Sequence, residues 1–202
     1  MTHRDTSLNS PHPQETPLQR FGATLRQYRQ QRRLSQPALA ARVGIRYSYI
    51  SEIELGKRNI SVLTLLRLTQ VLGLPAAWLF AHVDPRAPRV PPCPDGLRTA
   101  QAVPEASVRQ DDRAPTYPHD QAMLLPLLGA TIRQARHDQH LSQPTLAART
   151  GLNLTYLGQI EQGQRNLSVL SLLRIADALG VAVAHLLAPL ESQQSPSPPL
   201  PP

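Results

Sequence analysis

The chain contains two copies of one segment. Shifting the sequence by 107 positions aligns residues 21–81 with residues 128–188 without a gap, and 32 of the 61 aligned positions are identical. Two long copies indicate duplicated domains rather than the many short repeats of a solenoid. A segment of about 60 residues can fold alone if its core is well packed. The fold must therefore be one that a segment of this size can adopt twice.

The composition changes sharply outside the two copies. The start of the chain is polar, the middle is rich in proline and scattered charges, and the end is "ESQQSPSPPLPP". Because none of these stretches can bury much apolar surface, we expect all three to be disordered or extended. The predicted division is a tail at 1–17, a domain at 18–81, a proline-rich linker at 82–120, a second domain at 121–189 and a tail at 190–202.

Each copy shows a helical pattern throughout. Phe21, Leu25 and Tyr28 recur at helical spacing and predict a first helix over about 18–33. Serine N-caps and terminal glycines predict three more helices, and "PAAWLF" predicts a short fifth. These helices are expected at 36–43, about 47–55 and 62–72, and the second copy repeats each signal. Two short helices joined by a tight glycine turn form a helix-turn-helix.

Four sequence segments carry a recognisable motif. "LSQPALAARVGI" and "YISEIELGKRNISVLTLLRL" in the first copy correspond to "LSQPTLAARTGL" and "YLGQIEQGQRNLSVLSLLRI" in the second. They resemble the lambda-repressor-like (Cro/Xre-type) helix-turn-helix family, and the resemblance covers both copies but neither the tails nor the linker. It implies an all-α chain of two five-helix lambda-repressor-like domains joined by a Pro-rich linker. It also implies that the third helix of each domain enters the major groove of double-stranded DNA.

The resemblance also implies which residues contact DNA. The start of each third helix would touch base edges, and the glutamine that opens the second helix would touch the DNA backbone and brace the third helix. The loop after the third helix would lie near phosphates. In the first copy these positions are Gln36, Arg46, Tyr47, Ser48, Ser51, Glu52, Lys57, Arg58 and Asn59. In the second copy they are Gln143, Asn153, Leu154, Thr155, Gly158, Gln159, Gln164, Arg165 and Asn166.

The five base-contacting positions all differ between the copies, whereas the turn and core residues around them are shared. Arg46 suits a guanine or a phosphate, and Glu52 suits the amino group of cytosine. Asn153 and Gln159 suit adenines, and Leu154 suits a thymine methyl. A solvated helix surface would explain each of these side chains equally well. The pattern predicts that the two domains recognise different half-sites.

Glu54 and Glu161 are acidic at the same position of both copies. A carboxylate near DNA is repelled by phosphate, so we expect a partner within the protein. By the resemblance, the partners are Arg29 and Arg136 on the first helix of each copy, which would form structural ion pairs. The alternative is that these arginines contact phosphates.

The copies differ in charge and in their fifth helix. The whole chain has a net charge of +7, and residues 21–81 carry +7 whereas residues 128–188 carry +2. Because phosphate neutralisation supplies most non-specific affinity, the first copy should bind DNA more strongly. The second copy, which has Gly158 inside its third helix, is alternatively a module for pairing or for a protein partner. The family resemblance makes the fifth helix a candidate for self-association, with Trp78 either in the core or at a seam between copies or between chains.

Other classes of function find no support in the sequence. The histidines do not cluster with carboxylates or cysteine at catalytic or metal-ligand spacings, and Cys93 is the only cysteine. We expect no catalytic residue, metal, cofactor or small-molecule ligand, and a cytoplasmic, nucleoid-associated protein without a signal peptide or membrane span. The predicted function is a sequence-specific DNA-binding transcriptional regulator, with repression as the simplest mechanism. The alternative is a protein-interaction adaptor or antitoxin-like protein.

Overall fold

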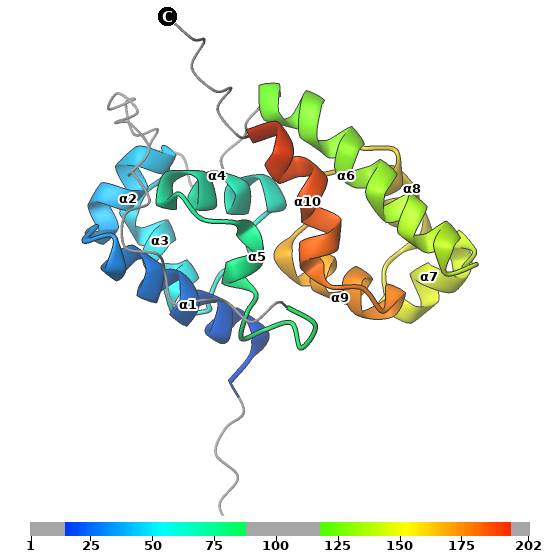
Figure 1. The fold of residues 1–202 in the computed structure, drawn as a ribbon, viewed down its shortest axis with the longest axis horizontal. Helices are drawn as coiled ribbons and strands as arrows, with labels where there is room; N and C mark the ends of the chain where they lie inside the picture. Colours follow the sequence, from blue (N-terminus) through cyan, green and yellow to red (C-terminus); the bar gives the residue numbers. More distant parts are fainter. Residues whose placement is uncertain (1–14, 88–117, 195–202) are drawn as a thin grey trace, which may run out of the picture.

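The computed structural model describes residues 15–87 and 118–194, which form ten α-helices and no β-strand (Figure 1). The first copy comprises α1 (Pro17–Gln31), α2 (Gln36–Val43), α3 (Tyr47–Glu54), α4 (Val62–Leu72) and α5 (Ala76–Leu79). The second comprises α6 (Pro118–Asp138), α7 (Gln143–Thr150), α8 (Leu154–Glu161), α9 (Val169–Leu179) and α10 (Val183–Gln194). The predicted all-α fold class is confirmed for this part of the chain, in which no single helix is long and apolar enough to cross a membrane.

Local chemistry sets the ends of the short helices. The Ser35 hydroxyl accepts a hydrogen bond from the backbone N–H of Ala38, 3.1 Å away, and so satisfies a donor that the helix leaves unpaired. Gly44 ends α2 with a φ of 77°, and Gly151 ends α7 with a φ of 65°. A left-handed residue at this place closes the helix and turns the chain, and glycine adopts that conformation without strain.

The third helix of each copy packs closely against the first. A Cβ at Gly22 would lie 2.3 Å from the carbonyl oxygen of Ile53, and a Cβ at Gly129 would lie 2.4 Å from that of Ile160. Only a residue without a side chain permits this approach, so both glycines fix the position of the third helix relative to the body of its copy.

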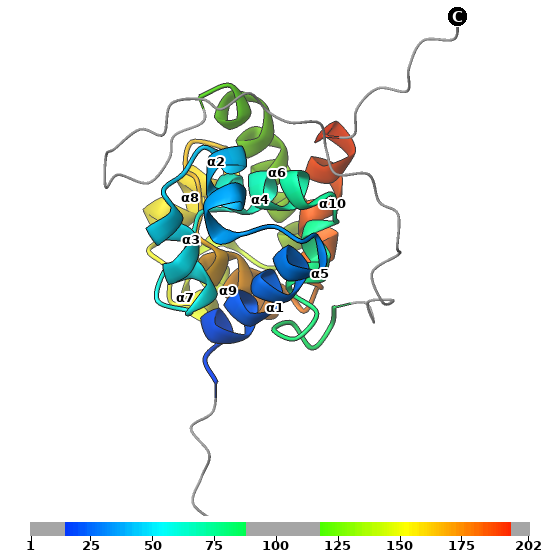
Figure 2. The ribbon, with the colours of Figure 1, turned by 90° about the vertical axis from the view of Figure 1, so that its left-hand side faces the viewer.

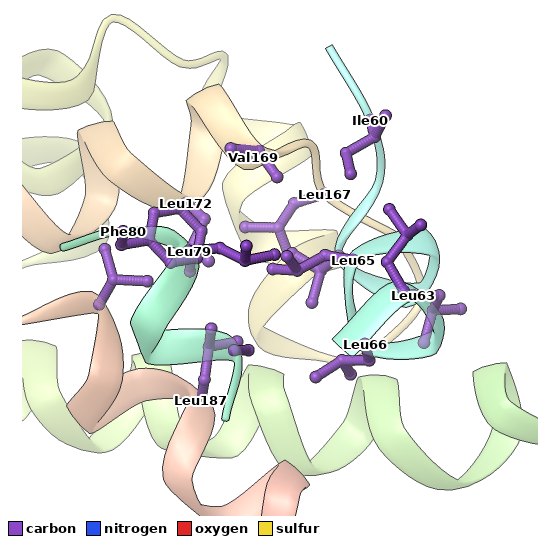
Figure 3. Close-up of a cluster of buried hydrophobic side chains, with 14 of the residues drawn as sticks. Ile60, Leu63, Leu65, Leu66, Leu79, Phe80, Leu167, Val169, Leu172 and Leu187 are labelled. Atoms are coloured by element: carbon purple, nitrogen blue, oxygen red, sulfur yellow. The ribbon is translucent and has the colours of Figure 1, made fainter. Parts of the chain in front are cut away.

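The hydrophobic core is shared by the two copies. One continuous cluster of buried side chains includes residues from both. Figure 3 shows Leu65, Leu79 and Phe80 of the first copy close to side chains of the second. Those of the second copy are Leu167, Leu172 and Leu187. All six are at most 1% exposed, and α5 packs on α10. Because separation would expose this apolar surface to water, the copies form one folded unit.

The contact between the copies has pseudo-two-fold symmetry. The N–H of Val62 donates to the carbonyl of Leu167 at 2.9 Å, and the N–H of Val169 donates to the carbonyl of Ile60 at 2.8 Å. These bonds flank an antiparallel bridge between Ser61 and Ser168. Each pair exchanges equivalent positions of the duplicated sequence, which is the pattern of an isologous dimer interface.

Two carboxylates cross the same interface. Asp84 Oδ2 accepts from the backbone N–H of Val183 at 2.8 Å, and Glu191 accepts from the backbone N–H of Ala76. Asp84 and Glu191 are equivalent positions of the two copies, as are Val183 and Ala76. Each copy therefore supplies an acceptor to the first turn of its neighbour's fifth helix, where the helix dipole favours negative charge.

These carboxylates correct the predicted domain limits. The sequence places residues 82–87 in the linker and 190–194 in the tail, yet Asp84 is 6% exposed and Leu190 is fully buried. Both segments are short and border proline-rich stretches, so their composition did not indicate a role in the interface. Residues 118–120 also differ from the linker prediction because α6 begins at Pro118, where a missing N–H costs little. The predicted N-terminal tail ends too late as well, because Thr16 caps α1 and Pro17 begins it. The other tail and linker residues, with Cys93, lie outside the described residues.

Candidate nucleic-acid interface

The two predicted DNA-contacting helices face the same side of the molecule. In Figure 1, α3 and α8 belong to opposite halves of the long axis, and in Figure 2 both lie toward the left edge with α2 and α7. The fifth helices, α5 and α10, lie toward the opposite edge in Figure 2. The contact between the copies thus leaves α3 and α8 on the same surface of the molecule.

The sequence of each third helix separates a buried face from an exposed one. In α3 the buried residues are Ile50, Ile53 and Glu54, so helical periodicity places Ser48 and Glu52 on the outer face. The first residue of each helix is a large exposed side chain, Tyr47 at 64% and Leu154 at 46%. The remaining outer residues of α8 are Thr155, which is exposed, and Gly158 and Gln159, which are partly exposed.

A buried ion pair holds the end of α3. Arg29 Nε and Nη2 donate to the two carboxylate oxygens of Glu54 at 2.6 and 2.9 Å, and Arg29 Nη1 donates to the carbonyl of Leu34 at 2.7 Å. The hydrogen bond to Glu54 raises the pKa of Arg29. Gln36 Nε2 also donates to Glu54, at 2.8 Å. Gln36 thus connects the start of α2 to the end of α3 and braces the third helix.

The second copy repeats this network around Glu161. Arg136 Nε and Nη2 donate to Glu161 at 2.7 and 3.0 Å, and Gln143 Nε2 donates at 2.8 Å. Burial alone would raise the pKa of Glu161, but the hydrogen bonds from Arg136 and Gln143 and the charges of Arg136 and Arg133 lower it. With side-chain exposures of 7% for Arg136 and 1% for Glu161, this pair joins helices within the fold and leaves little surface for DNA.

The loop after each third helix places an arginine side chain beside the outer face of that helix. Arg58 Nε pairs with Glu52, and the Arg58 guanidinium lies 4.7 Å from the centre of the Tyr49 ring. In the second copy, Arg165 Nε donates to Gln159 Oε1 at 3.0 Å. Tyr49 was not among the predicted site residues, although both copies carry tyrosine at this position, at 49 and 156. The two outer faces thus share one geometry with different charge.

Two asparagines have protein partners for their side-chain oxygens. Asn153 Oδ1 accepts from the N–H groups of Thr155 and Tyr156 at 2.8 and 3.3 Å, which makes Asn153 the N-cap of α8. Asn59 Oδ1 accepts from the N–H of Leu170 across the contact between copies, at 3.2 Å. A bidentate contact with adenine needs both atoms of an amide. The adenine contact of Asn153 stays a prediction, and a bidentate form of it would compete with the cap of α8.

The other loop positions stay near the outer face. The N–H of Lys57 donates to the carbonyl of Glu52 at 2.9 Å, and the N–H of Gln164 donates to that of Gln159 at 2.8 Å. Lys57 and Gln164 are both exposed. Arg46 precedes α3 as its N-cap residue without a side-chain capping bond. The Asn166 side chain is partly buried. No group of three or more candidate metal ligands occurs among the described residues.

Comparison with known proteins identifies the same two segments. The family model HTH_3, described as helix-turn-helix, matches residues 25–79 and 132–186. The HTH-type transcriptional regulator y4dJ of Sinorhizobium fredii is 35% identical over 65 residues, covering 32% of this chain and 84% of that protein. Control protein C.SmaI of Serratia marcescens is 38% identical over 61 residues, covering 30% of this chain and 73% of its own length.

Among solved structures, the restriction-modification controller protein C.AhdI from Aeromonas hydrophila is similar. It shares 40% sequence identity, with a TM-score of 0.30, over 31% of this chain and 94% of its own. The match to y4dJ extends over most of that relative but only 32% of the present chain. One copy thus corresponds in length to nearly a whole relative.

Proposed function

The chain belongs to the Cro/C1-type helix-turn-helix family, and from that premise we propose that it is a sequence-specific double-stranded DNA-binding transcriptional regulator. Its two domains contact two different half-sites in the major groove. The relatives named as an HTH-type transcriptional regulator and as a control protein support this class of function.

One observation carries the proposal. The two third helices lie on one side of a single folded unit, while their outer residues differ at every proposed base-contacting position. A surface that contacts DNA through both helices can then bind an asymmetric site with one chain. The five differing pairs are Arg46 and Asn153, Tyr47 and Leu154, Ser48 and Thr155, Ser51 and Gly158, and Glu52 and Gln159.

The spacing of the half-sites follows from the contact between the copies. A flexible linker alone would allow a range of spacings, because its ends are free to approach or separate. The shared core and the paired bonds at Ser61 and Ser168 hold α3 and α8 in one relative position. Half-sites one helical turn apart, about 34–36 Å, are the usual arrangement for paired helix-turn-helix domains.

We favour repression as the regulatory outcome. Occupying an operator blocks polymerase without any further protein part, whereas activation requires a contact surface for polymerase. The chain then acts as a pseudo-dimer, with α5 engaged on α10 within the same molecule. Measuring transcription from a promoter that overlaps the selected site, with and without the protein, tests this outcome. A rise in transcription would contradict it.

Selection of binding sites from random duplex DNA tests the DNA-binding proposal. We expect the full chain, at a stated salt concentration, to enrich two unlike half-sites at one fixed spacing. A palindromic site would instead mean that one domain contacts bases while chains pair. Failure to enrich any sequence would contradict the proposal and favour a protein partner.

A charge-reversal variant adds a second test. Arg46→Glu combined with Lys57→Glu should abolish DNA binding, because both positions lie at the first copy's outer face. The matched control is Arg26→Glu with Arg174→Glu, which makes the same change in net charge at exposed positions of α1 and α9. Equal losses in the two double variants would indicate only a general effect of net charge.

A further inference from the structure

We infer that Glu52 and Gln159 give the two domains opposite hydrogen-bonding requirements at equivalent base positions. Glu52 presents an acceptor to the base edge, and Gln159 presents a donor. This inference rests on the proposed DNA-binding function and adds to it the residue pair that makes the two half-sites chemically unlike.

The two side chains occupy one structural position. Glu52 lies one helical turn after Ser48 in α3. Gln159 lies one helical turn after Thr155 in α8. Each is contacted by the Nε atom of an arginine six residues later, Arg58 or Arg165. The loop that follows has the same backbone geometry in both copies. The N–H of Lys57 donates to the carbonyl of Glu52 at 2.9 Å, and the N–H of Gln164 donates to the carbonyl of Gln159 at 2.8 Å. The difference between the copies is therefore in the side-chain chemistry.

In the first copy, Arg58 fixes the direction of the Glu52 carboxylate. Glu52 Oε2 pairs with Arg58, whose guanidinium is itself placed against the Tyr49 ring. An ionised carboxylate only accepts hydrogen bonds, so its second oxygen needs a donor. In the major groove the base donors are the amino groups of cytosine and adenine. Cytosine is the preferred partner of glutamate, and Arg58 offsets the repulsion between Glu52 and phosphate.

In the second copy, Arg165 leaves Gln159 with a donor. A guanidinium has no acceptor, so the Gln159 atom 3.0 Å from Arg165 Nε must be the amide oxygen. The Gln159 amino group, with two N–H donors, is then the part that remains for DNA. It suits guanine O6 or N7, or thymine O4. This assignment differs from the adenine contact predicted from the sequence, because a bidentate contact with adenine also requires the amide oxygen.

An exchange of the two residues tests the inference. Binding sites are selected with the full-length wild type, with Glu52→Gln and with Gln159→Glu, under identical salt. Glu52→Gln should change the preferred base at one position of the first half-site from cytosine or adenine to guanine or thymine. Gln159→Glu should make the reverse change in the second half-site. The change in base preference should be about tenfold, which is the usual scale for one good base contact.

Each variant contains its own control, because the half-site bound by the other domain should keep its sequence. Glu52→Ala is a further control and should relax the preference at that position without reversing it. If the wild type selects a two-part site but neither exchange changes the base, the inference is overturned while the proposed function stands. If the wild type selects no site, the proposed function itself fails, and the inference with it. A loss of affinity that spares base preference would also overturn the inference.

Discussion

At the scale of single residues, an arginine–glutamate ion pair has one role when it is buried and another when it is exposed. The side chains of Arg29 and Glu54 are 9% and 3% exposed, whereas those of Arg58 and Glu52 are 39% and 41% exposed. Removing one member of a buried pair leaves a charge without compensation, but water compensates an exposed one. The first pair therefore holds α3 in place, and the second shapes the surface that α3 presents.

Arg29→Ala should lower the free energy of unfolding by about 3–5 kcal/mol, because Glu54 is left buried without its cation. Arg58→Ala should lower it by about 1 kcal/mol or less, because its pair is largely solvated. Chemical denaturation of both variants at neutral pH measures the difference. Equal losses would mean that burial does not separate the two pairs.

Glu191 gives the stability of the chain a specific pH dependence. Burial at the contact between copies raises the pKa of Glu191, and hydrogen bonds from the backbone of Ala76 and Ala77 only partly offset this. Because the folded-state pKa lies above the unfolded value, the folded chain holds this proton more tightly. Its contribution to stability is complete below the unfolded pKa and is lost as the pH rises through the folded pKa.

Glu191→Gln keeps a side-chain oxygen for Ala76 but removes the titration. Relative to wild type, we expect the variant to gain stability progressively as the pH rises through the folded pKa of Glu191. Denaturation of both proteins across this interval measures the difference, in which all other titrating groups cancel. A difference that does not change with pH would contradict the assigned burial.

At the scale of elements, the short helices could be predicted because their limits are local. Ser35 and Gly44 mark the start and end of α2 by their own chemistry, and Gln36 was assigned a bracing role that its bond to Glu54 supports. The role of Asn153 could not be predicted in the same way. Asparagine suits both a helix N-cap and an adenine, and only the backbone geometry shows that its oxygen caps α8.

The sequence named the fifth helix as a candidate for self-association, but it did not predict the shared core or the two carboxylates that join the copies. Leu79 and Leu172 would be apolar in an isolated domain as well as in a docked pair, so their pattern does not separate the two cases. Asp84 and Glu191 lie beside proline-containing segments whose composition indicates a linker or tail. Their equivalence in the duplicated sequence was the available signal, but the aligned segment of 61 positions ends before them.

Two glycines on neighbouring helices should respond oppositely to the same substitution. Gly158 lies inside α8, and a Cβ there would meet no atom of a neighbouring element within 4 Å, whereas a Cβ at Gly129 would lie 2.4 Å from the carbonyl oxygen of Ile160. Gly158→Ala should stabilise the chain by about 1 kcal/mol through helix propensity. Gly129→Ala should destabilise it by forcing α6 and α8 apart. Thermal denaturation of the two variants checks both signs, and a stabilising Gly129→Ala would refute the close packing.

At the scale of the whole molecule, the contact between the copies has a larger role than the covalent connection. The shared core and the carboxylates Asp84 and Glu191 join the domains through residues that lie within the two copies or directly after them. The arrangement of α3 and α8 is accordingly a property of the fold. A tether would raise the local concentration of the second domain but would not fix its orientation.

Cutting the connection should leave the pair assembled. A protease site placed between residues 88 and 117, once cleaved, should yield two fragments that sediment together and retain affinity for the two-part site. Inserting about five base pairs between the half-sites should instead abolish two-domain binding, because it rotates one half-site by about half a turn of DNA. Fragments that separate on cleavage, or affinity that tolerates the insertion, would show that the linker joins independent domains.

The bridge between Ser61 and Ser168 has a consequence for how such a protein can vary. In an assembly of two identical chains, every substitution at the seam occurs twice, so a large side chain or a charge meets its own copy near the axis. Here the two sides of the seam are encoded by separate codons of one gene. Ile60 and Leu167 are equivalent positions of the two copies, as are Asp84 and Glu191, so the two sides of the seam already carry different residues. A substitution on one side of the seam can therefore occur without the same substitution on the other side, so the two sides can evolve independently, as in a heterodimer.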